Sequence, residues 1–238
     1  KNLIEAEEIK REIIELYRDD FAKQKNENPI YVASIFGVIP SELSNHDKRF
    51  KYTHINSQAR KREYNGAFNW LVKAYIVNPC YNSTDPSVLP TLTMSGLDFK
   101  AYLIDTGLLY TLSFMDANQD ELFYKSLILD KLHLNEGMFA ENYISQALKN
   151  NGKKLFYYEK RDENTYRTII EIDFLTIQNR KITPLEVKSG DNITLKSLKK
   201  FKDTFKNTVN NGIVLYDGDI KIVDDILYLP LFMINYLK

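Results

Sequence analysis

Apolar residues recur at helical spacing in the first part of the chain. They do so over residues 3–25 and again over residues 56–74, with charged positions in between. This pattern predicts two amphipathic helices that each bury one face. A short apolar segment, residues 30–39, lies between them and has a proline at either end. We therefore expect the N-terminal part of the protein to be mainly helical.

The helical pattern ends at Ile76 and Val77, which begin a predicted strand, loop and strand. The loop, residues 78–90, is rich in Asn, Ser, Asp and Pro, which favour turns. Several helices followed by a short strand, a loop and a second strand are typical of a winged helix. We predict a winged-helix-like domain over residues 1–95.

Residues 96–238 form the second predicted domain, in which strands follow helices. A connector over residues 99–110 leads into it, and helices are predicted over residues 136–150 and 193–207. The predicted strands cover residues 155–159, 169–177, 182–188, 212–216 and 219–230. The order α-β-β-β-α-β-β indicates a mixed sheet flanked by helices, so the predicted fold class is α/β or α+β.

The composition is that of an ordinary soluble protein with a real core. Hydrophobic residues make up 44% of the 238 positions, and 32 Lys and Arg balance 32 Asp and Glu. No global field therefore draws the chain onto polyanions or membranes. The apolar run over residues 229–234 is too short to span a bilayer. A single cysteine, Cys80, excludes an internal disulfide, and without a secretory signal we expect a cytoplasmic protein.

Two classes of site are excluded by simple patterns. The nine glycines form neither a P-loop nor a GxGxxG motif, so we expect no ATPase activity from this chain. Three histidines and one cysteine cannot make a standard structural zinc site. Because the first residue is Lys1 rather than Met, we expect the chain to be a piece of a longer protein.

The most informative stretch holds the strands predicted over residues 169–177 and 182–188. They are expected to form an antiparallel hairpin that turns at Asn179 and Arg180, since Asn tolerates the positive φ that a tight turn requires. A symmetric loop at this point fixes the register of the two strands.

That register places Asp173 opposite Glu186 and Glu171 opposite Lys188. Because side chains alternate along a strand, all four are predicted on one face of the hairpin. Directly opposed β-carbons lie roughly 4.5–5.5 Å apart, and like charges at that distance are destabilising. A divalent cation between Asp173 and Glu186 would remove the repulsion. Mg²⁺ prefers such hard oxygen ligands and keeps waters for the chemistry.

Two further side chains complete the predicted site. Lys188 would lie beside the metal, where it can orient or help deprotonate the attacking water, or neutralise charge growing on a phosphate. In the helix over residues 136–150, Glu141 falls at the border of the apolar stripe beside Leu148. Such a residue can reach the end of the sheet without entering the core. This placement permits a metal contact but does not demand one.

Glu141 on a helix, Asp173 on a strand and Glu186-Val187-Lys188 on the next strand resemble the PD-(D/E)XK nuclease-like fold. More narrowly, the chain resembles the C-terminal half of a family of prokaryotic AAA+ ATPases with a winged helix and a nuclease-like tail. The stretches that resemble the tail are FKAYLIDTGLLY, GMFAENYI, EIDFL and TPLEVKSG, and those that resemble the winged helix are IPSELS, RFKYTHI and EYNGAFNWLVKAYIV.

The resemblance implies Asp173 and Glu186 as ligands of Mg²⁺ or Mn²⁺, Lys188 as the catalytic lysine and Glu141 as an accessory carboxylate that completes the metal shell. It also implies DNA as a partner and an ATPase module in cis that would precede Lys1. The residue before Asp173 is isoleucine rather than the proline of the motif name, at a position that varies widely among these nucleases.

The sequence is therefore consistent with two functions from different classes. The first is a nuclease dependent on Mg²⁺ or Mn²⁺, and the second is a catalytically silent module that docks DNA or a protein for the ATPase. The complete set of carboxylates and lysine favours the nuclease. The absence of an excess of positive charge favours the silent module. For the residues themselves, the alternative to a metal site is an exposed hairpin with a Glu171–Lys188 ion pair, which would contribute little.

Two basic segments are further candidates for contacting phosphates. Residues 48–62 contain six Lys and Arg and no acid, interleaved with Phe50 and Tyr52. The helix over residues 193–207 follows the predicted site directly, and its lysines include Lys196, Lys199, Lys200 and Lys202. For both segments a solvated charged face is the alternative.

Overall fold

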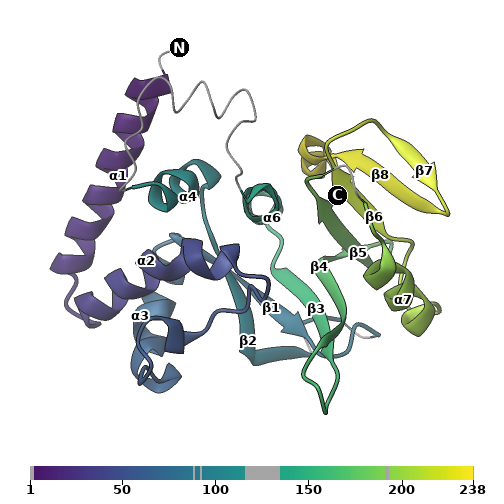
Figure 1. The fold of residues 1–238 in the computed structure, drawn as a ribbon, viewed down its shortest axis with the longest axis horizontal. Helices are drawn as coiled ribbons and strands as arrows, with labels where there is room; N and C mark the ends of the chain where they lie inside the picture. Colours follow the sequence, from purple (N-terminus) through teal and green to yellow (C-terminus); the bar gives the residue numbers. More distant parts are fainter. Residues whose placement is uncertain (1–2, 88, 92, 116–134, 191–192, 238) are drawn as a thin grey trace. The chain divides into compact units, whose positions relative to one another are not determined.

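The computed structural model describes residues 3–87, 89–91, 93–115, 135–190 and 193–237 (Figure 1). It separates into two compact units, of which the first combines Lys1–Asn78 with Ala101–Phe139 and the second combines Pro79–Lys100 with Ala140–Lys238. The proposed division into domains 1–95 and 96–238 stays a prediction. Among the described residues, no helix combines the length and the apolar character that a membrane span requires.

The first unit is built from helices. The helices predicted over residues 3–25 and 56–74 correspond to α1 and α3, while the apolar segment 30–39 lies inside α2. Asn28 caps α2 by accepting a hydrogen bond from the Ile30 amide at 3.0 Å. The described helices of this unit include α1 (Leu3–Lys23), α2 (Pro29–Ser44), α3 (Lys61–Lys73) and α4 (Thr106–Ser113), with a 3₁₀ turn at Tyr52–His54.

An aromatic cluster holds three of these helices together. The ring of Phe21 on α1 meets that of Phe36 on α2 edge-on at a centroid distance of 5.3 Å. The same ring meets Trp70 of α3 at 5.8 Å, again nearly perpendicular. Such T-shaped pairs add to the free energy gained from burying the rings. The helical periodicity of the sequence therefore corresponds to a real apolar core.

The described strands form one mixed sheet in the order β2-β1-β3-β4-β5-β6-β8-β7 (Figure 1). The β1–β3, β5–β6 and β6–β8 pairs are parallel, and the β3–β4, β4–β5 and β7–β8 pairs are antiparallel. The mixed α/β class predicted from the sequence is thus confirmed. The strands are β1 (Val77–Ser83), β2 (Met94–Leu103), β3 (Leu155–Arg161), β4 (Thr168–Gln178), β5 (Lys181–Lys188), β6 (Ile213–Tyr216), β7 (Lys221–Val223) and β8 (Ile226–Pro230).

Strand β1 replaces part of the predicted loop over residues 78–90. Cys80 of β1 pairs in parallel with Leu155 of β3, so β1 belongs to the main sheet rather than to a wing. Asn82 is 8% exposed, and its side-chain oxygen accepts a hydrogen bond from the Glu159 amide at 3.0 Å. A residue type that usually signals a turn is therefore buried here and satisfied by the neighbouring strand.

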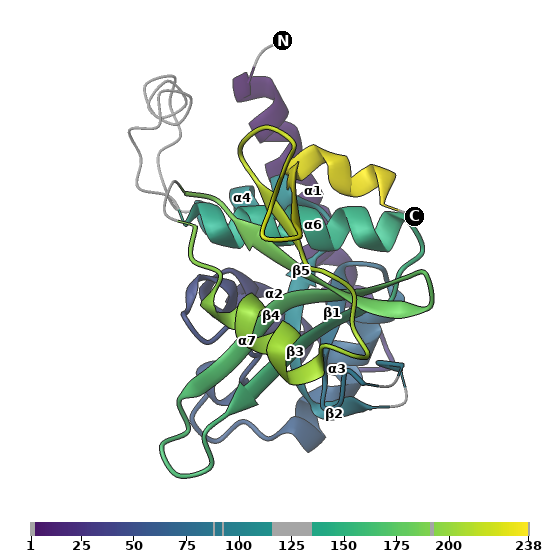
Figure 2. The same cartoon turned by 90° about the vertical axis from the view of Figure 1, so that its right-hand side faces the viewer.

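The remaining helical elements of the described residues are α6 (Glu136–Asn150), α7 (Lys196–Phe205) and the 3₁₀ segment Leu231–Tyr236. Helix α6 has the predicted bounds, and α7 is shorter than the predicted 193–207. Helix α7 packs against β4, as Figure 2 shows. Its buried residues Leu198 and Phe201 share a core with residues of β3 and β4, including Phe156, Tyr158, Ile170 and Ile172.

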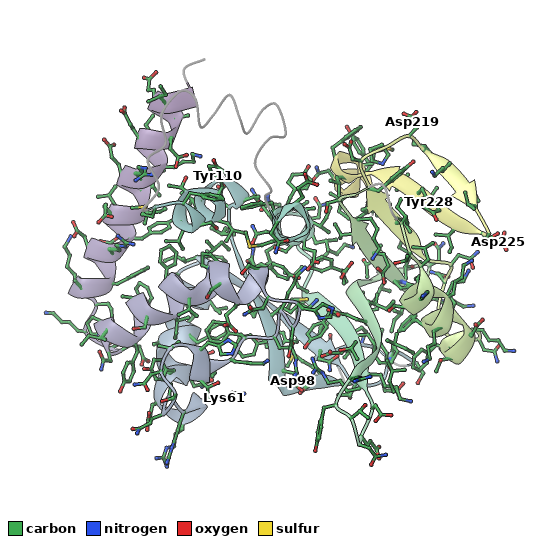
Figure 3. All side chains as sticks on the ribbon, viewed as in Figure 1. Lys61, Asp98, Tyr110, Asp219, Asp225 and Tyr228 are labelled. Carbon is green, nitrogen blue, oxygen red and sulfur yellow. The ribbon has the colours of Figure 1, made fainter. Side chains whose placement is uncertain are left out.

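Two hairpins of the second unit, β4–β5 and β7–β8, turn through pairs of residues with positive φ. In the β4–β5 turn, φ is 51° at Asn179 and 65° at Arg180, the conformation expected of a type I′ turn. The register runs from Gln178–Lys181 to Phe174–Leu185, which confirms the predicted pairing over this part of the hairpin. The β7–β8 turn has φ of 51° at Asp224 and 61° at Asp225, and Figure 3 places Asp225 at its tip.

We expect Arg180→Gly to stabilise the protein by about 0.5–1 kcal/mol. A residue with a β-carbon is strained at positive φ, and the relief from glycine exceeds the flexibility that glycine adds to the unfolded chain. Urea unfolding followed by circular dichroism would measure the change. Arg180→Ala, which keeps the β-carbon, is the control. Equal stabilities of the two variants would contradict the assignment of the turn.

Candidate active site

The β4–β5 ladder ends one residue before the predicted carboxylate pair. Its last pair is Phe174–Leu185, and beyond this point β5 runs parallel to β6, with Glu186 beside Val214. The Asp173 carboxylate accepts a hydrogen bond from the Val187 amide at 2.8 Å in place of a further ladder bond. A fork between the two strands therefore begins where the charged residues start.

A β-bulge lies in β4 at the same place. Phe156 pairs with Leu175 and Tyr158 with Ile172, so Asp173 and Phe174 together face the single residue Tyr157 of β3. A bulge of this kind changes the direction of the side chain that it carries and is common beside functional sites. The strict alternation assumed from the sequence does not hold across Asp173.

A pocket of about 170 Å³ occupies the fork. Four of its lining residues come from the strands and are those that the sequence placed on one face: Glu171, Asp173, Glu186 and Lys188. The others come from the segment before α7 and from its first turn: Thr194, Lys196 and Ser197. The structure thus brings the predicted pair of carboxylates and the lysine together. Sequence reasoning missed the hydroxyl groups of Thr194 and Ser197.

Glu186 and Lys188 form the closest ion pair of the pocket. The Lys188 ammonium lies 2.6 Å from Oε2 of Glu186, whose side chain is almost wholly buried. The other oxygen, Oε1, has no hydrogen-bond partner among the described residues. An unpaired buried carboxylate oxygen is costly, so this atom marks a place where a cation or a water is needed.

The Glu171–Lys188 ion pair considered as an alternative is not formed. Glu171 binds the ammonium group of Lys100 instead, at 2.8 Å. Lys100 lies on β2, is 1% exposed, and its ammonium group is also 5.0 Å from the centre of the Tyr157 ring. Sequence reasoning missed this residue. The available signal was a lysine inside the otherwise apolar run from Phe99 to Ile104.

Burial and repulsion between carboxylates raise the pKa values of both central carboxyls. The pKa of Asp173 is raised to about 6 by burial and by the charge of Glu141, against the attraction of Lys100 and Lys188. The pKa of Glu186 is raised to about 8 by burial and by Asp173. Burial alone would lower the pKa of Lys188, but Glu186 and Asp173 outweigh it and raise that pKa. Such a cluster is typical of functional sites.

Glu141 lies deeper than predicted. It is 5% exposed, whereas the sequence placed it at the border of the buried stripe of α6. The physical reason is that α6 buries polar residues as well as apolar ones, since Asn142 and Ser145 are both fully buried. Glu141 does not line the pocket, and it acts on the site through its charge, which raises the pKa of Asp173.

The donor set fits a hard divalent cation that keeps most of its waters. Within the described ranges, no group of three or more His, Cys, Asp or Glu side chains is arranged to hold a metal. Asp173 and Glu186 nevertheless line one pocket, and the buried Oε1 of Glu186 has no hydrogen-bond partner among the described residues. Mg²⁺ is commonly held by one or two carboxylates and completes its shell with water and substrate oxygens.

The first basic segment is less exposed than its sequence indicates. Phe50 and Tyr52 are buried in the helical unit, at 6% and 8% exposure, and so do not interleave with the charges at the surface. Asp47, just before the segment, binds Arg49 at 3.0 Å and Lys51 at 2.9 Å. These contacts hold the pKa of Asp47 well below its usual value, even though burial opposes them. Arg49 and Lys51 are therefore paired with an acid that lies just outside the segment.

Comparison with known proteins gives two matches, both to domains of unknown function. Residues 2–119 match the model of DUF8612, and residues 136–233 match the model of DUF4143. The second match includes α6, the β4–β5 hairpin and α7, and hence every residue predicted for the site. No curated protein and no solved structure matches the chain.

We expect Glu186→Gln to stabilise the metal-free protein at pH 9 by about 1 kcal/mol or more, since each unit of pKa displacement corresponds to about 1.4 kcal/mol. The pKa of the Glu186 carboxyl is 4.5 in the unfolded chain and about 8 in the folded protein. Its contribution to stability is therefore complete below pH 4.5 and is lost as the pH rises from there through about 8. The neutral amide does not undergo this loss. Urea unfolding in a chelator at pH 6 to 9 would measure it.

The control for that measurement is Glu163→Gln, which removes the same charge at an exposed position. Its stability should follow the wild-type curve across the pH range. The free energy of unfolding of Glu186→Gln should differ from that of the wild type by an amount that changes with pH. If this difference stays constant from pH 6 to pH 9, the burial of an ionisable Glu186 is contradicted.

We expect Lys100→Met to destabilise the protein by about 3 kcal/mol, because it leaves the Glu171 carboxylate without its buried cation. Adding Glu171→Gln to this variant should recover part of the loss. Denaturant unfolding of the two single variants and the double variant would give the coupling energy. Lys160→Met, at an exposed position of β3, is the control. Additive effects of the two substitutions would show that Lys100 and Glu171 do not interact.

Proposed function

We propose that this protein hydrolyses phosphodiester bonds in DNA with the help of Mg²⁺ or Mn²⁺. One observation carries the proposal: Asp173, Glu186 and Lys188 line one small pocket, and a buried oxygen of Glu186 has no hydrogen-bond partner among the described residues. A pair of repelling carboxylates weakens the fold unless a cation binds there. The adjacent lysine suits a reaction in which negative charge develops.

Each residue would have a separate role. Asp173 and Glu186 would hold the metal, and Glu141 on α6, which does not line the pocket, would act on the site through its charge. The hydrogen bond from the Val187 amide fixes the direction of the Asp173 carboxylate. When bound, the metal would supply Lewis acidity and lower the pKa of a bound water.

Lys188 is better suited to donate than to accept a proton. Its pKa is raised by Glu186 and Asp173, so its ammonium group stays charged at neutral pH. Of the roles considered from the sequence, neutralising charge on the phosphate or orienting the attacking water is therefore favoured over deprotonating that water. The contact with Glu186 holds the ammonium group beside the metal ligands.

The proposal extends to the kind of fold and protein. The order α6-β3-β4-β5-α7-β6 and the carboxylate–lysine set support a PD-(D/E)XK nuclease-like domain in a cytoplasmic protein of the AAA+ ATPase family, with the ATPase in cis. A winged-helix role for the first unit would rest on its helices alone, because β1 pairs with β3.

The silent binding module remains the second candidate because of one observation. The Lys188 ammonium group is already held by Glu186, and a lysine that stayed in this contact would only balance charge. The module would bind DNA or a protein without needing a metal. The two candidates therefore differ in their dependence on divalent cations and in the consequence of replacing Lys188.

We expect Mn²⁺ to bind the full chain in calorimetric titration and Asp173→Asn to abolish the binding. Lys188→Met should keep the binding and lower the rate of DNA cleavage by about 10²-fold or more. A control is Lys199→Met, which changes a lysine outside the pocket. If millimolar Mn²⁺ does not bind, even with duplex DNA present, the nuclease proposal fails. DNA binding that weakens with added salt but does not depend on the divalent metal would then support the silent module.

A further inference from the structure

The pocket in the β4–β5 fork has a second wall with different chemistry. Thr194, Lys196 and Ser197 line it together with the strand residues and offer two hydroxyl groups and one ammonium group. The Ser197 oxygen accepts a hydrogen bond from the Glu171 amide at 3.4 Å, so the hydroxyl proton is left to donate elsewhere. A wall of donors is what a phosphate oxygen requires.

The start of α7 is unusual for a helix that binds nothing. The residue before it, Leu195, makes no side-chain capping bond, and the first turn contains no acidic residue. The first helical position is Lys196, and a positive charge at a helix N-terminus is opposed by the helix dipole. A bound anion would instead interact favourably with both the helix dipole and Lys196. It could also accept hydrogen bonds from the first amides of α7, since the side chain of Leu195 does not cap them.

An independent feature of the same pocket points to a ligand. Glu186 is 3% exposed and lines the pocket, and its Oε1 atom has no hydrogen-bond partner among the described residues. The pocket therefore suits a cation on the strand side and an anion on the helix side. Its volume of about 170 Å³ equals that of roughly six waters in the liquid. This space can hold a phosphate group beside a metal.

We infer that Thr194, Lys196 and Ser197 bind the phosphate group of the substrate, next to the metal held by Asp173 and Glu186. This inference rests on the proposed function and assigns metal binding and phosphate binding to different parts of the pocket. The strands set the affinity for the metal, and the first turn of α7 sets the affinity for the phosphodiester. Lys199 has no part in this, because it pairs with Asp224 at 3.0 Å and does not line the pocket.

Dimethyl phosphate is a suitable probe, because it carries the phosphodiester group and no base. With protein in excess over Mn²⁺, the paramagnetic broadening of its ³¹P resonance reports phosphate bound near the metal. We expect Lys196→Gln to weaken its binding about tenfold, the effect of losing one charge-assisted contact. Ser197→Ala should weaken it to a smaller degree. The calorimetric affinity for Mn²⁺ should change less than about twofold in both variants.

Lys199→Gln is the matched control, since it removes the same charge from the same helix outside the pocket. It should leave both the phosphate and the Mn²⁺ affinities as in the wild type. If Lys196→Gln and Lys199→Gln bind dimethyl phosphate equally well while Mn²⁺ binding is intact, the phosphate wall is refuted and the metal site stands. If the wild type binds no Mn²⁺ at all, the proposed function itself fails.

Discussion

The carboxyl groups of Asp173 and Glu186 line one pocket, Glu186 almost wholly buried, and the surrounding structure depends on how their repulsion is offset. Burial raises the pKa of both groups, and Asp173 further raises that of Glu186, which has one oxygen without a partner among the described residues. Lys188 neutralises one side of the pair, and Lys100 with Glu171 provides a second ion pair nearby. Such an arrangement is less stable than an apolar core of the same volume would be. Its presence therefore favours a function over a purely structural role.

The same core that stabilises the second unit also builds the pocket. Leu198 and Phe201 of α7 are packed into the apolar cluster of β3 and β4. Because Ser197 directly precedes Leu198, this packing holds the first turn of α7 against the fork. On the other side, β5 continues alongside β6 after it leaves β4, which keeps Glu186 on a rigid strand. Side chains on regular elements held by a core are positioned more accurately than those on loops.

Local patterns predicted most of the elements, and they failed where distant parts of the chain decide the structure. The bounds of α6, the positive φ at Asn179 and Arg180 and the register up to Phe174–Leu185 follow from periodicity and turn chemistry. The bulge at Asp173 depends on β3, which the hairpin alone does not contain. Lys100 comes from a strand 71 residues away from its partner Glu171. No spacing within the hairpin could have indicated that contact.

The neutral charge of the whole chain favoured a silent module when only the composition was considered, but the charges are sorted locally. An average over all charged residues does not describe the fork, where carboxylates line the strand side and Lys196 with two hydroxyl groups lines the helix side. Electrostatic interactions between exposed groups fall off within about 10 Å at moderate salt, so the local arrangement decides what binds. A pocket with both signs of charge suits a metal and a phosphate together, and this combination is what separates phosphodiester hydrolysis from simple attraction to a polyanion.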